Sequence, residues 1–160
     1  MNDARRLTLT RSFDAPCAEV YRLWTEPALV SQWWGIQGST VQLCELDVRV
    51  GGRWRIYMQT ASGKLYPNAG EYIEVIPNSR LVYSDEPDPS IAEWHGDIPG
   101  RIQHTVRFDQ LDLATLVTLD VTFASAADRR RLVGFGMDKG LEQGLDRLTQ
   151  LLTRLLPVDP

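Results

Sequence analysis

The sequence contains few of the residues that build metal or redox sites. In 160 residues there are two cysteines, Cys17 and Cys44, and two histidines, His95 and His104. The cysteines form no CxxC pair, and none of these four residues falls in the spacing of a zinc site. We therefore expect no bound metal, and we interpret both cysteines as small hydrophobic residues in a reducing compartment.

Motifs for nucleotide binding and for hydrolase nucleophiles are missing as well. The chain has no GxxxxGKS/T loop, no GxGxxG after a strand pattern and no GxSxG elbow, so neither nucleotide binding nor hydrolase chemistry has motif support. The balance of 17 basic and 21 acidic side chains lacks the positive excess of proteins that bind nucleic acid. The one basic run, 129–131, is interpreted as a solvated helix face. We expect no cofactor and no nucleic-acid partner.

Long apolar runs are absent too. No segment is apolar over enough residues to predict a membrane span. Residues 1–6 are polar and lead into a strand pattern instead of the apolar core of a signal peptide, so we expect a cytoplasmic protein. What the chain does have is an ordinary globular composition, 43% hydrophobic and 24% charged, in 160 residues. This length predicts a single domain over residues 1–160.

Two periodicities predict an α+β fold. Alternating apolar and polar residues predict strands over 7–13, 39–50, 53–58, 70–76, 80–84, 102–108 and 117–123. Helical spacing predicts two short helices after the first strand, over about 17–24 and 27–34. A slip in the alternation predicts a β-bulge near 44–45, and we expect Ile73 and Val75 to face inward.

A long helix is predicted at the end of the chain. From Met137 onward leucines recur at three- and four-residue steps until Pro157. An antiparallel sheet can be covered on one face only, and this helix is the only predicted element long enough to cover it. We therefore expect a sheet of about six to seven strands that curves around the helix, which packs in the concave face.

The inward strand face includes several candidate functional residues. Trp54 and Met58 share that face in one strand, and His104 lies on the inward alternation of another. His104 is either a cavity residue, acting as a hydrogen-bond donor or general base, or a satisfied core histidine, and the residues leave both readings open. Trp24 is expected in the core. Trp94, in the long loop of residues 85–100, is a candidate lid, whereas we expect its neighbour His95 at the surface.

Three glycines recur near the start of the last helix. Gly136, Gly140 and Gly144 lie four residues apart, although each costs about 1 kcal/mol relative to alanine in a helix. Either strand side chains approach closely there, or the missing side chains leave space beside the sheet. We favour the second reading, which indicates a cavity.

Short motifs in a fixed order carry a resemblance to a known family. They are Phe13-Asp14-Ala15-Pro16, Trp33-Trp34-Gly35, the Arg-x-Gly-Gly-Arg-Trp of residues 49–54, Gly70-Glu71-Tyr72, Arg80-Leu81-Val82-Tyr83, Gly136-Met137 and Leu145-Asp146-Arg147-Leu148. With this element order, the chain resembles the START-like (SRPBCC) superfamily. Within it, the motifs are similar to the branch named for the activator of heat-shock protein 90 ATPase, in its C-terminal domain.

The resemblance implies a helix-grip fold of the Bet v 1 type, with a deep cavity for lipids, polyketides, hormones or other hydrophobic molecules. Two positions depart from the family pattern. Residues 112–115 replace a tight Asp-Gly-type turn, and Met137 stands where many relatives have tryptophan. We expect the second departure to affect the ligand. The eukaryotic activator has an additional N-terminal chaperone-binding domain, whereas this chain begins at the first strand, so we expect cochaperone activity to be a minor alternative.

We predict that the protein is a noncatalytic or weakly catalytic binder of a small aromatic, lipid-like or polyketide-like molecule. The residues expected to line its cavity are Trp34, Trp54, Met58, Tyr83, Trp94, His104, Phe135, Met137, Gly140, Leu141 and Gly144. One alternative is an enzyme of the polyketide cyclase or hydrolase type, with His104 as base and Tyr83 or Tyr72 as a polar partner. Another is a stress-response or chaperone accessory protein that acts through its surface. The sequence leaves the oligomeric state open between a monomer and a homodimer.

Overall fold

One curved sheet of seven antiparallel strands is the largest part of the structure. The computed structural model describes residues 3–155, within which the strands lie in the spatial order β1-β7-β6-β5-β4-β3-β2. Their bounds are β1 (Arg6–Phe13), β2 (Thr40–Leu46), β3 (Arg53–Gln59), β4 (Leu65–Ile76), β5 (Arg80–Asp85), β6 (Ile102–Leu111) and β7 (Ala114–Thr122). Strands β2 to β6 each pair with the next strand in the chain, and β1 pairs with β7. The predicted antiparallel meander is confirmed.

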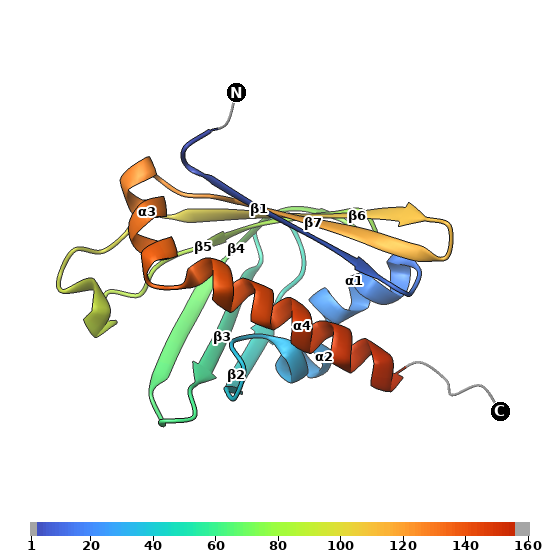
Figure 1. Cartoon of the computed structure of the whole chain (residues 1–160), viewed down its shortest axis with the longest axis horizontal. Coiled ribbons are helices and arrows are strands. Elements are labelled where there is room, and N and C mark those ends of the chain that lie inside the picture. The colour runs from blue at the N-terminus through green and yellow to red at the C-terminus, as the bar shows by residue number, and fades with distance from the viewer. Residues whose placement is uncertain (1–2, 156–160) are drawn as a thin grey trace.

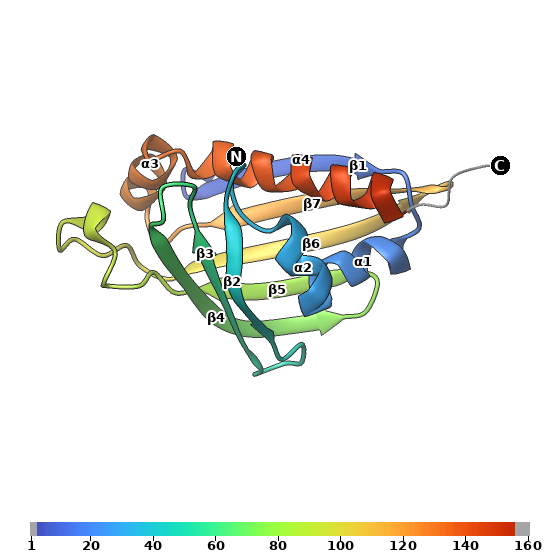
Figure 2. The same cartoon turned by 90° about the horizontal axis from the view of Figure 1, so that it is seen from below.

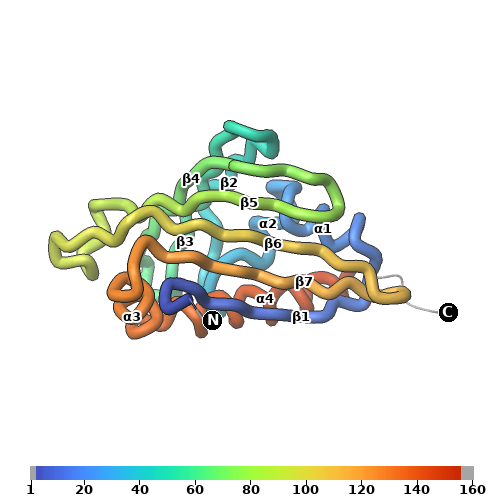
Figure 3. The backbone as a smooth tube through the Cα atoms, turned by 90° about the horizontal axis from the view of Figure 1, so that it is seen from above, coloured from blue at the N-terminus to red at the C-terminus, as the bar shows by residue number. Residues whose placement is uncertain are grey.

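The helices lie on one face of this sheet. Helices α1 (Cys17–Thr25) and α2 (Pro27–Trp33) follow β1, whereas α3 (Ala126–Gly134) and α4 (Met137–Leu155) follow β7. Figures 1 and 2 show α4 running along the sheet, with α1 and α2 on the same side. From the opposite side the strands lie in front of the helices (Figure 3). This arrangement confirms the predicted helix-grip fold.

The predicted end of the last helix at Pro157 lies outside the described residues. Among the helices that the structure describes, none is both long enough and apolar enough to cross a bilayer.

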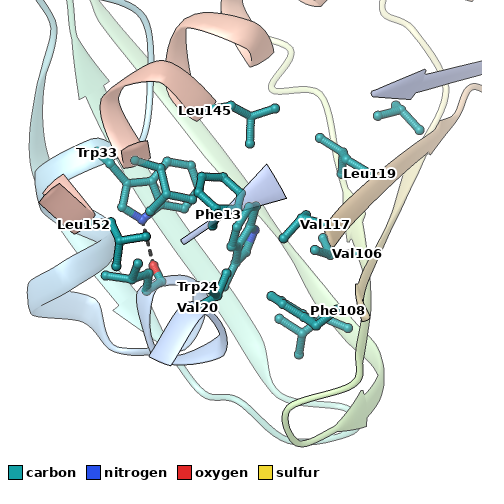
Figure 4. Close-up of a cluster of buried hydrophobic side chains, with 14 of the residues drawn as sticks. Phe13, Val20, Trp24, Trp33, Val106, Phe108, Val117, Leu119, Leu145 and Leu152 are labelled. Carbon is teal, nitrogen blue, oxygen red and sulfur yellow. Dashed lines mark hydrogen bonds between the residues drawn. The ribbon is translucent and has the colours of Figure 1, made fainter. Parts of the chain in front are cut away.

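The core lies between α4, the two short helices and the strands. The rings of Trp24 and Trp33 lie 4.9 Å apart, and Trp24 also packs edge-on against Phe108 at 5.7 Å. Figure 4 shows these rings among side chains from α4, including Leu145 and Leu152, and side chains from the strands. Trp24 is 7% exposed, so its predicted place in the core is confirmed.

Two β-bulges change the predicted facing of side chains. The register of β2 against β3 shifts at Gln42, not at 44–45 as predicted. A second shift, in β4, inserts Ile73 between Tyr72 and the next paired residue. A bulge sets two residues against one and so resets the alternation. Tyr72 is therefore buried and Ile73 is exposed, and the prediction that Ile73 faces inward was wrong.

Strand β4 is longer than predicted because it includes Pro67. Around this proline, residues 65–71 pair with β3, and the pairing with β5 begins only at residues 72–76. A strand accommodates proline where one of its sides is an edge. Just before the change of partner, at Gly70, an added Cβ atom would collide with the carbonyl oxygen of Ser84. Residues 65–69, which lie outside the predicted strand of residues 70–76, are therefore part of β4.

Helix α3 was not predicted. Its first turn is capped by Ser125, whose Oγ accepts a hydrogen bond of 3.0 Å from the backbone N–H of Asp128. The helix carries the basic run 129–131, in which Arg131 pairs with Asp97 of the preceding long loop. The run is thus not only a solvated face as predicted, because it also ties the loop to α3.

Candidate functional site

A cavity of about 500 Å³ lies between the sheet and the first half of α4. Its walls come from α1, α2, strands β2 to β7, the long loop of residues 86–101, α3 and α4. All eleven residues that the sequence predicted as lining lie on these walls: Trp34, Trp54, Met58, Tyr83, Trp94, His104, Phe135, Met137, Gly140, Leu141 and Gly144. Their role in binding a ligand stays a prediction.

Tryptophan dominates the walls. The chain contains five tryptophans, and all of them line the cavity: Trp24, Trp33, Trp34, Trp54 and Trp94. Three of the five indole N–H groups donate to backbone carbonyl oxygens, at 2.7 Å for Trp33, 2.9 Å for Trp54 and 3.0 Å for Trp94. Since the protein itself satisfies these polar atoms, the three rings offer mainly hydrocarbon surface to a bound molecule.

One region of the wall is polar, where β5 pairs with β6. Tyr83 and His104 are paired residues in this ladder, and their rings stack with centroids 5.0 Å apart and planes at 11°. His104 Nε2 lies 3.4 Å from Asp85 Oδ2, and His104 Nδ1 has no hydrogen-bond partner among the described residues. His104 is 4% exposed and lines the cavity, which confirms that its side chain faces inward.

Tyr72, which is buried, and Tyr83, which is half-buried, are neutral hydrogen-bonding groups near this region. Burial raises the pKa of Tyr83, and the neighbouring Asp85 carboxylate raises it further. Burial also raises the pKa of Tyr72, whose ring lies 6.2 Å from that of Tyr83. Both phenols therefore keep their protons over the whole physiological range and can donate to a ligand.

The charged residues on the walls are all acidic. They are Asp85, Glu86, Asp88 and Glu93, and no lysine or arginine of the described residues lines the cavity. No group of three histidine, cysteine or carboxylate side chains within residues 3–155 is placed to hold a metal ion. The polar chemistry that the cavity offers is thus hydrogen bonding and negative charge.

The glycines of α4 lie against the segment between α2 and β2, not against strands. A Cβ atom on Gly140 would lie 3.3 Å from Cγ2 of Ile36, and one on Gly144 would lie 3.7 Å from the carbonyl oxygen of Gly35. Both glycines also line the cavity, so close approach and open space occur together. Gly136 precedes the helix, with φ of +94°, and so it is not part of a stripe on α4 as predicted.

Aromatic side chains from two loops meet at one end of the cavity. Trp94, in the short 3-10 helix Ala92–Trp94, lies 6.0 Å from Phe135 between ring centroids. The guanidinium of Arg131 lies 5.9 Å from the centre of the Trp94 ring. Trp94 is half-buried, and His95 beside it is exposed as predicted. A lid role for Trp94 stays a prediction.

Sequence reasoning missed several lining residues. Trp24 was assigned to the core, Trp33 was not chosen, and Asp85 was assigned to the loop of residues 85–100, although they all line the cavity. The other missed residues include Leu81, Ile102, Leu119, Leu132 and Leu145. Most of them share the inward alternation or the helical face of residues that were chosen, so the signal was present but did not separate core from cavity.

Comparisons with known proteins agree with this architecture. The family model described as Activator of Hsp90 ATPase homolog 1-like protein matches residues 14–153. Protein NE0264 from Nitrosomonas europaea has a similar structure, with a TM-score of 0.82 at 22% identity, covering 96% of this chain and 97% of that chain. A protein from Arthrobacter aurescens has a TM-score of 0.82 at 21% identity, covering 99% of this chain and 92% of that chain. Protein Ms6760 from Mycobacterium smegmatis has a TM-score of 0.81 at 21% identity, covering 99% of this chain and 94% of that chain.

No curated protein matches the sequence. At these identities the solved structures show the fold alone. The family model, in contrast, spans most of the sequence, from the end of β1 to the last turns of α4. The chain therefore belongs to the family of Activator of Hsp90 ATPase homolog 1-like proteins.

Proposed function

We propose that the protein binds a small, mainly apolar molecule in the cavity between the sheet and α4. The observation that carries the proposal is a hollow of about 500 Å³ whose walls include all five tryptophans. Pockets for small ligands typically measure about 300–1,000 Å³ and are lined mostly by apolar and aromatic side chains with a few polar groups. An aromatic, lipid-like or polyketide-like molecule fits this description.

The position of the tryptophans makes the proposal easy to test. A ligand in the cavity contacts the indole rings, so it changes the intrinsic fluorescence of the protein. The neutral dye N-phenylnaphthylamine supplies a second signal, because its emission rises in an apolar site. We expect saturable dye binding that apolar competitors reverse.

A matched pair of variants separates cavity binding from surface binding. Leu141 lines the cavity, whereas Leu155 lies on the same helix, outside the cavity, and is 51% exposed. Leu141→Trp fills part of the hollow and should weaken dye binding several-fold, and Leu155→Trp should leave it unchanged. Equal binding by both variants, or no binding of any apolar molecule to the wild type, would refute the proposal.

A second candidate function is an enzyme of the polyketide cyclase or hydrolase type. It is favoured by one observation, the 3.4 Å approach of Asp85 to the buried His104. A carboxylate beside an imidazole can orient it as a general base. The test compares hydrolysis of nitrophenyl esters by the wild type and by His104→Gln, with circular dichroism to establish that the variant folds. Equal rates in the two folded proteins would exclude this role.

A third candidate is a stress or chaperone accessory protein, which rests on the family description alone. Its test is the ATPase rate of an Hsp90 chaperone with and without the protein. An unchanged rate would remove this candidate. The cytoplasmic location of the protein stays a prediction as well.

A further inference from the structure

The four carboxylates on the cavity wall differ in how they are paired. Glu86 Oε2 accepts a hydrogen bond of 2.8 Å from Arg53 Nη2. Glu93 accepts one of 3.0 Å from the hydroxyl of Tyr66 and forms an ion pair with Lys64. These two carboxylates are therefore neutralised by basic side chains that lie outside the cavity wall.

Asp88 is satisfied locally, by its own loop. Its Oδ1 accepts hydrogen bonds from the backbone N–H of Ser90, at 2.8 Å, and from the Ser90 hydroxyl. Three of the four acidic groups thus have donors within the protein, although Oε2 of Glu93 is buried without a hydrogen-bond partner in the described part of the chain. All three accept hydrogen bonds from side chains or backbone of the protein, and two of them also pair with a basic side chain.

Asp85 is different, because its one charged contact is the imidazole of His104. Its side chain is 19% exposed, and within residues 3–155 no lysine or arginine nitrogen lies within 4.0 Å of it. The His104 side chain is 6% exposed, and its Nδ1 has no hydrogen-bond partner among the described residues. The Asp85 carboxylate keeps part of its contact with water, but it lies on a largely apolar wall without a lysine or arginine partner among these residues, and the incomplete hydration of such a charge is unfavourable.

Aromatic side chains lie on the same part of the cavity wall as this carboxylate. Tyr83, two residues before Asp85 on the same strand face, stacks on His104 and packs edge-on against Trp54 at 5.7 Å. Tyr72 packs against Tyr83 from β4. The faces of such rings attract organic cations, and the attraction grows when water is excluded.

We propose that the ligand is a hydrophobic amine, whose ammonium group pairs with Asp85 while its apolar body contacts the tryptophan-rich walls. The inference rests on the proposed function, since it assumes that the cavity binds small molecules. It adds the sign of the ligand's charge and the residue that recognises it. A carboxylic acid of the same size would meet only like charge on the wall and should be rejected.

Three probes of one chain length test the charge preference: octylamine, octanol and octanoate. Near pH 7 they carry a positive charge, no charge and a negative charge. Isothermal titration calorimetry and tryptophan quenching measure each dissociation constant, at physiological ionic strength to screen long-range attraction to the acidic protein. We expect octylamine to bind at least about tenfold more tightly than octanol, because a hydrogen bond to a charged group ordinarily contributes that much to affinity. Octanoate should bind most weakly.

Two isosteric variants identify the residue responsible. Asp85→Asn should abolish the advantage of octylamine over octanol. Asp112→Asn removes the same charge from the exposed turn between β6 and β7, where φ is +53°, a conformation that asparagine tolerates. This control should keep the full preference for octylamine.

The outcomes separate the two levels of the proposal. Equal binding of octylamine and octanol to the wild type would overturn the amine inference and leave the binding function standing. A preference that survives in Asp85→Asn would also overturn it. Failure of all three probes to bind would refute the binding function itself.

Discussion

Replacement of Arg147 tests whether one side chain of α4 holds a wall of the cavity in place. Its guanidinium donates to four oxygen atoms in the segment between α2 and β2. Nη1 contacts the carbonyl oxygens of Trp34 at 3.3 Å and Ile36 at 2.9 Å, and the Oγ of Ser39 at 3.0 Å, whereas Nη2 contacts the Ser39 carbonyl at 3.2 Å. Trp34 and Ile36 line the cavity, so Arg147→Met removes the fork that fixes this wall.

The expected loss follows from these contacts. A hydrogen bond from a charged donor contributes about 1.5–3 kcal/mol, but the four bonds share one guanidinium, and the freed oxygen atoms on this half-buried segment regain water. Burial also lowers the pKa of Arg147, which shows that desolvation offsets part of the gain. We expect Arg147→Met to reduce the free energy of unfolding by about 2–3 kcal/mol. For a domain of this size that lowers the melting temperature by roughly 4–12 °C.

Urea unfolding and thermal unfolding of the variant measure the loss. Arg154→Met is the control, because Arg154 is exposed in the last turn of the same helix and its replacement should change the free energy of unfolding by less than about 0.5 kcal/mol. The Arg147 variant should also bind apolar probes more weakly, since the wall is no longer fixed. If the two variants are equally stable, the four contacts do not hold the segment and the reasoning is wrong.

Two further predictions concern buried polar groups on the sheet. The fully buried hydroxyl of Thr115 donates a hydrogen bond of 2.7 Å to the carbonyl oxygen of Ala15. Thr115→Val leaves that oxygen unpaired, so it should lower the free energy of unfolding, measured in urea, by about 1–3 kcal/mol. A decrease below about 0.5 kcal/mol would contradict this. Burial opposes ionisation of Asp120, but hydrogen bonds from Thr8 and Arg6 outweigh it and hold the pKa of Asp120 below its ordinary value. An acid whose pKa is lower in the folded than in the unfolded state stabilises the fold at pH values above the unfolded-state pKa. This contribution is lost as the pH falls through the folded-state pKa. The difference in free energy of unfolding between wild type and Asp120→Asn should therefore be largest near pH 7 and shrink below about pH 4, and a constant difference would argue against the role.

The strand pattern predicted the fold because one face of each strand is buried. Errors in the predicted facing and length of strands arose where local geometry interrupts the two-residue alternation of side chains. Ile73 was placed inward because a bulge of one residue leaves no compositional mark, and only the pairing of β4 with β5 reveals it. The strand was predicted to begin only at residue 70, after Pro67, although β4 begins at Leu65 and one of its sides is an edge at the proline. For α3, the capping pattern of Ser125 with Asp128 was the signal that could have found it.

The candidate site was predicted less completely than the fold, and Asp85 shows why. The strand was predicted to end at Ser84, so the acid after it was assigned to the loop. In the structure β5 includes Asp85, which pairs with Ile102. Leu81, Tyr83 and Asp85 then share one face at steps of two residues. An element boundary is the least certain part of a prediction from sequence, and here a single residue decides whether a charge enters the cavity.

Helix α4 combines a cavity wall and a packed core along its length. In its first half Gly140, Leu141 and Gly144 line the cavity. In its second half Leu148 and Leu151 are almost fully buried and lie outside the cavity wall. Truncating either leucine to alanine creates a void in the packed core and costs about 2–5 kcal/mol, whereas Leu141→Ala enlarges an existing hollow and should cost less in urea unfolding. Equal losses for Leu141→Ala and Leu148→Ala would show that the first half of α4 is packed as tightly as the second.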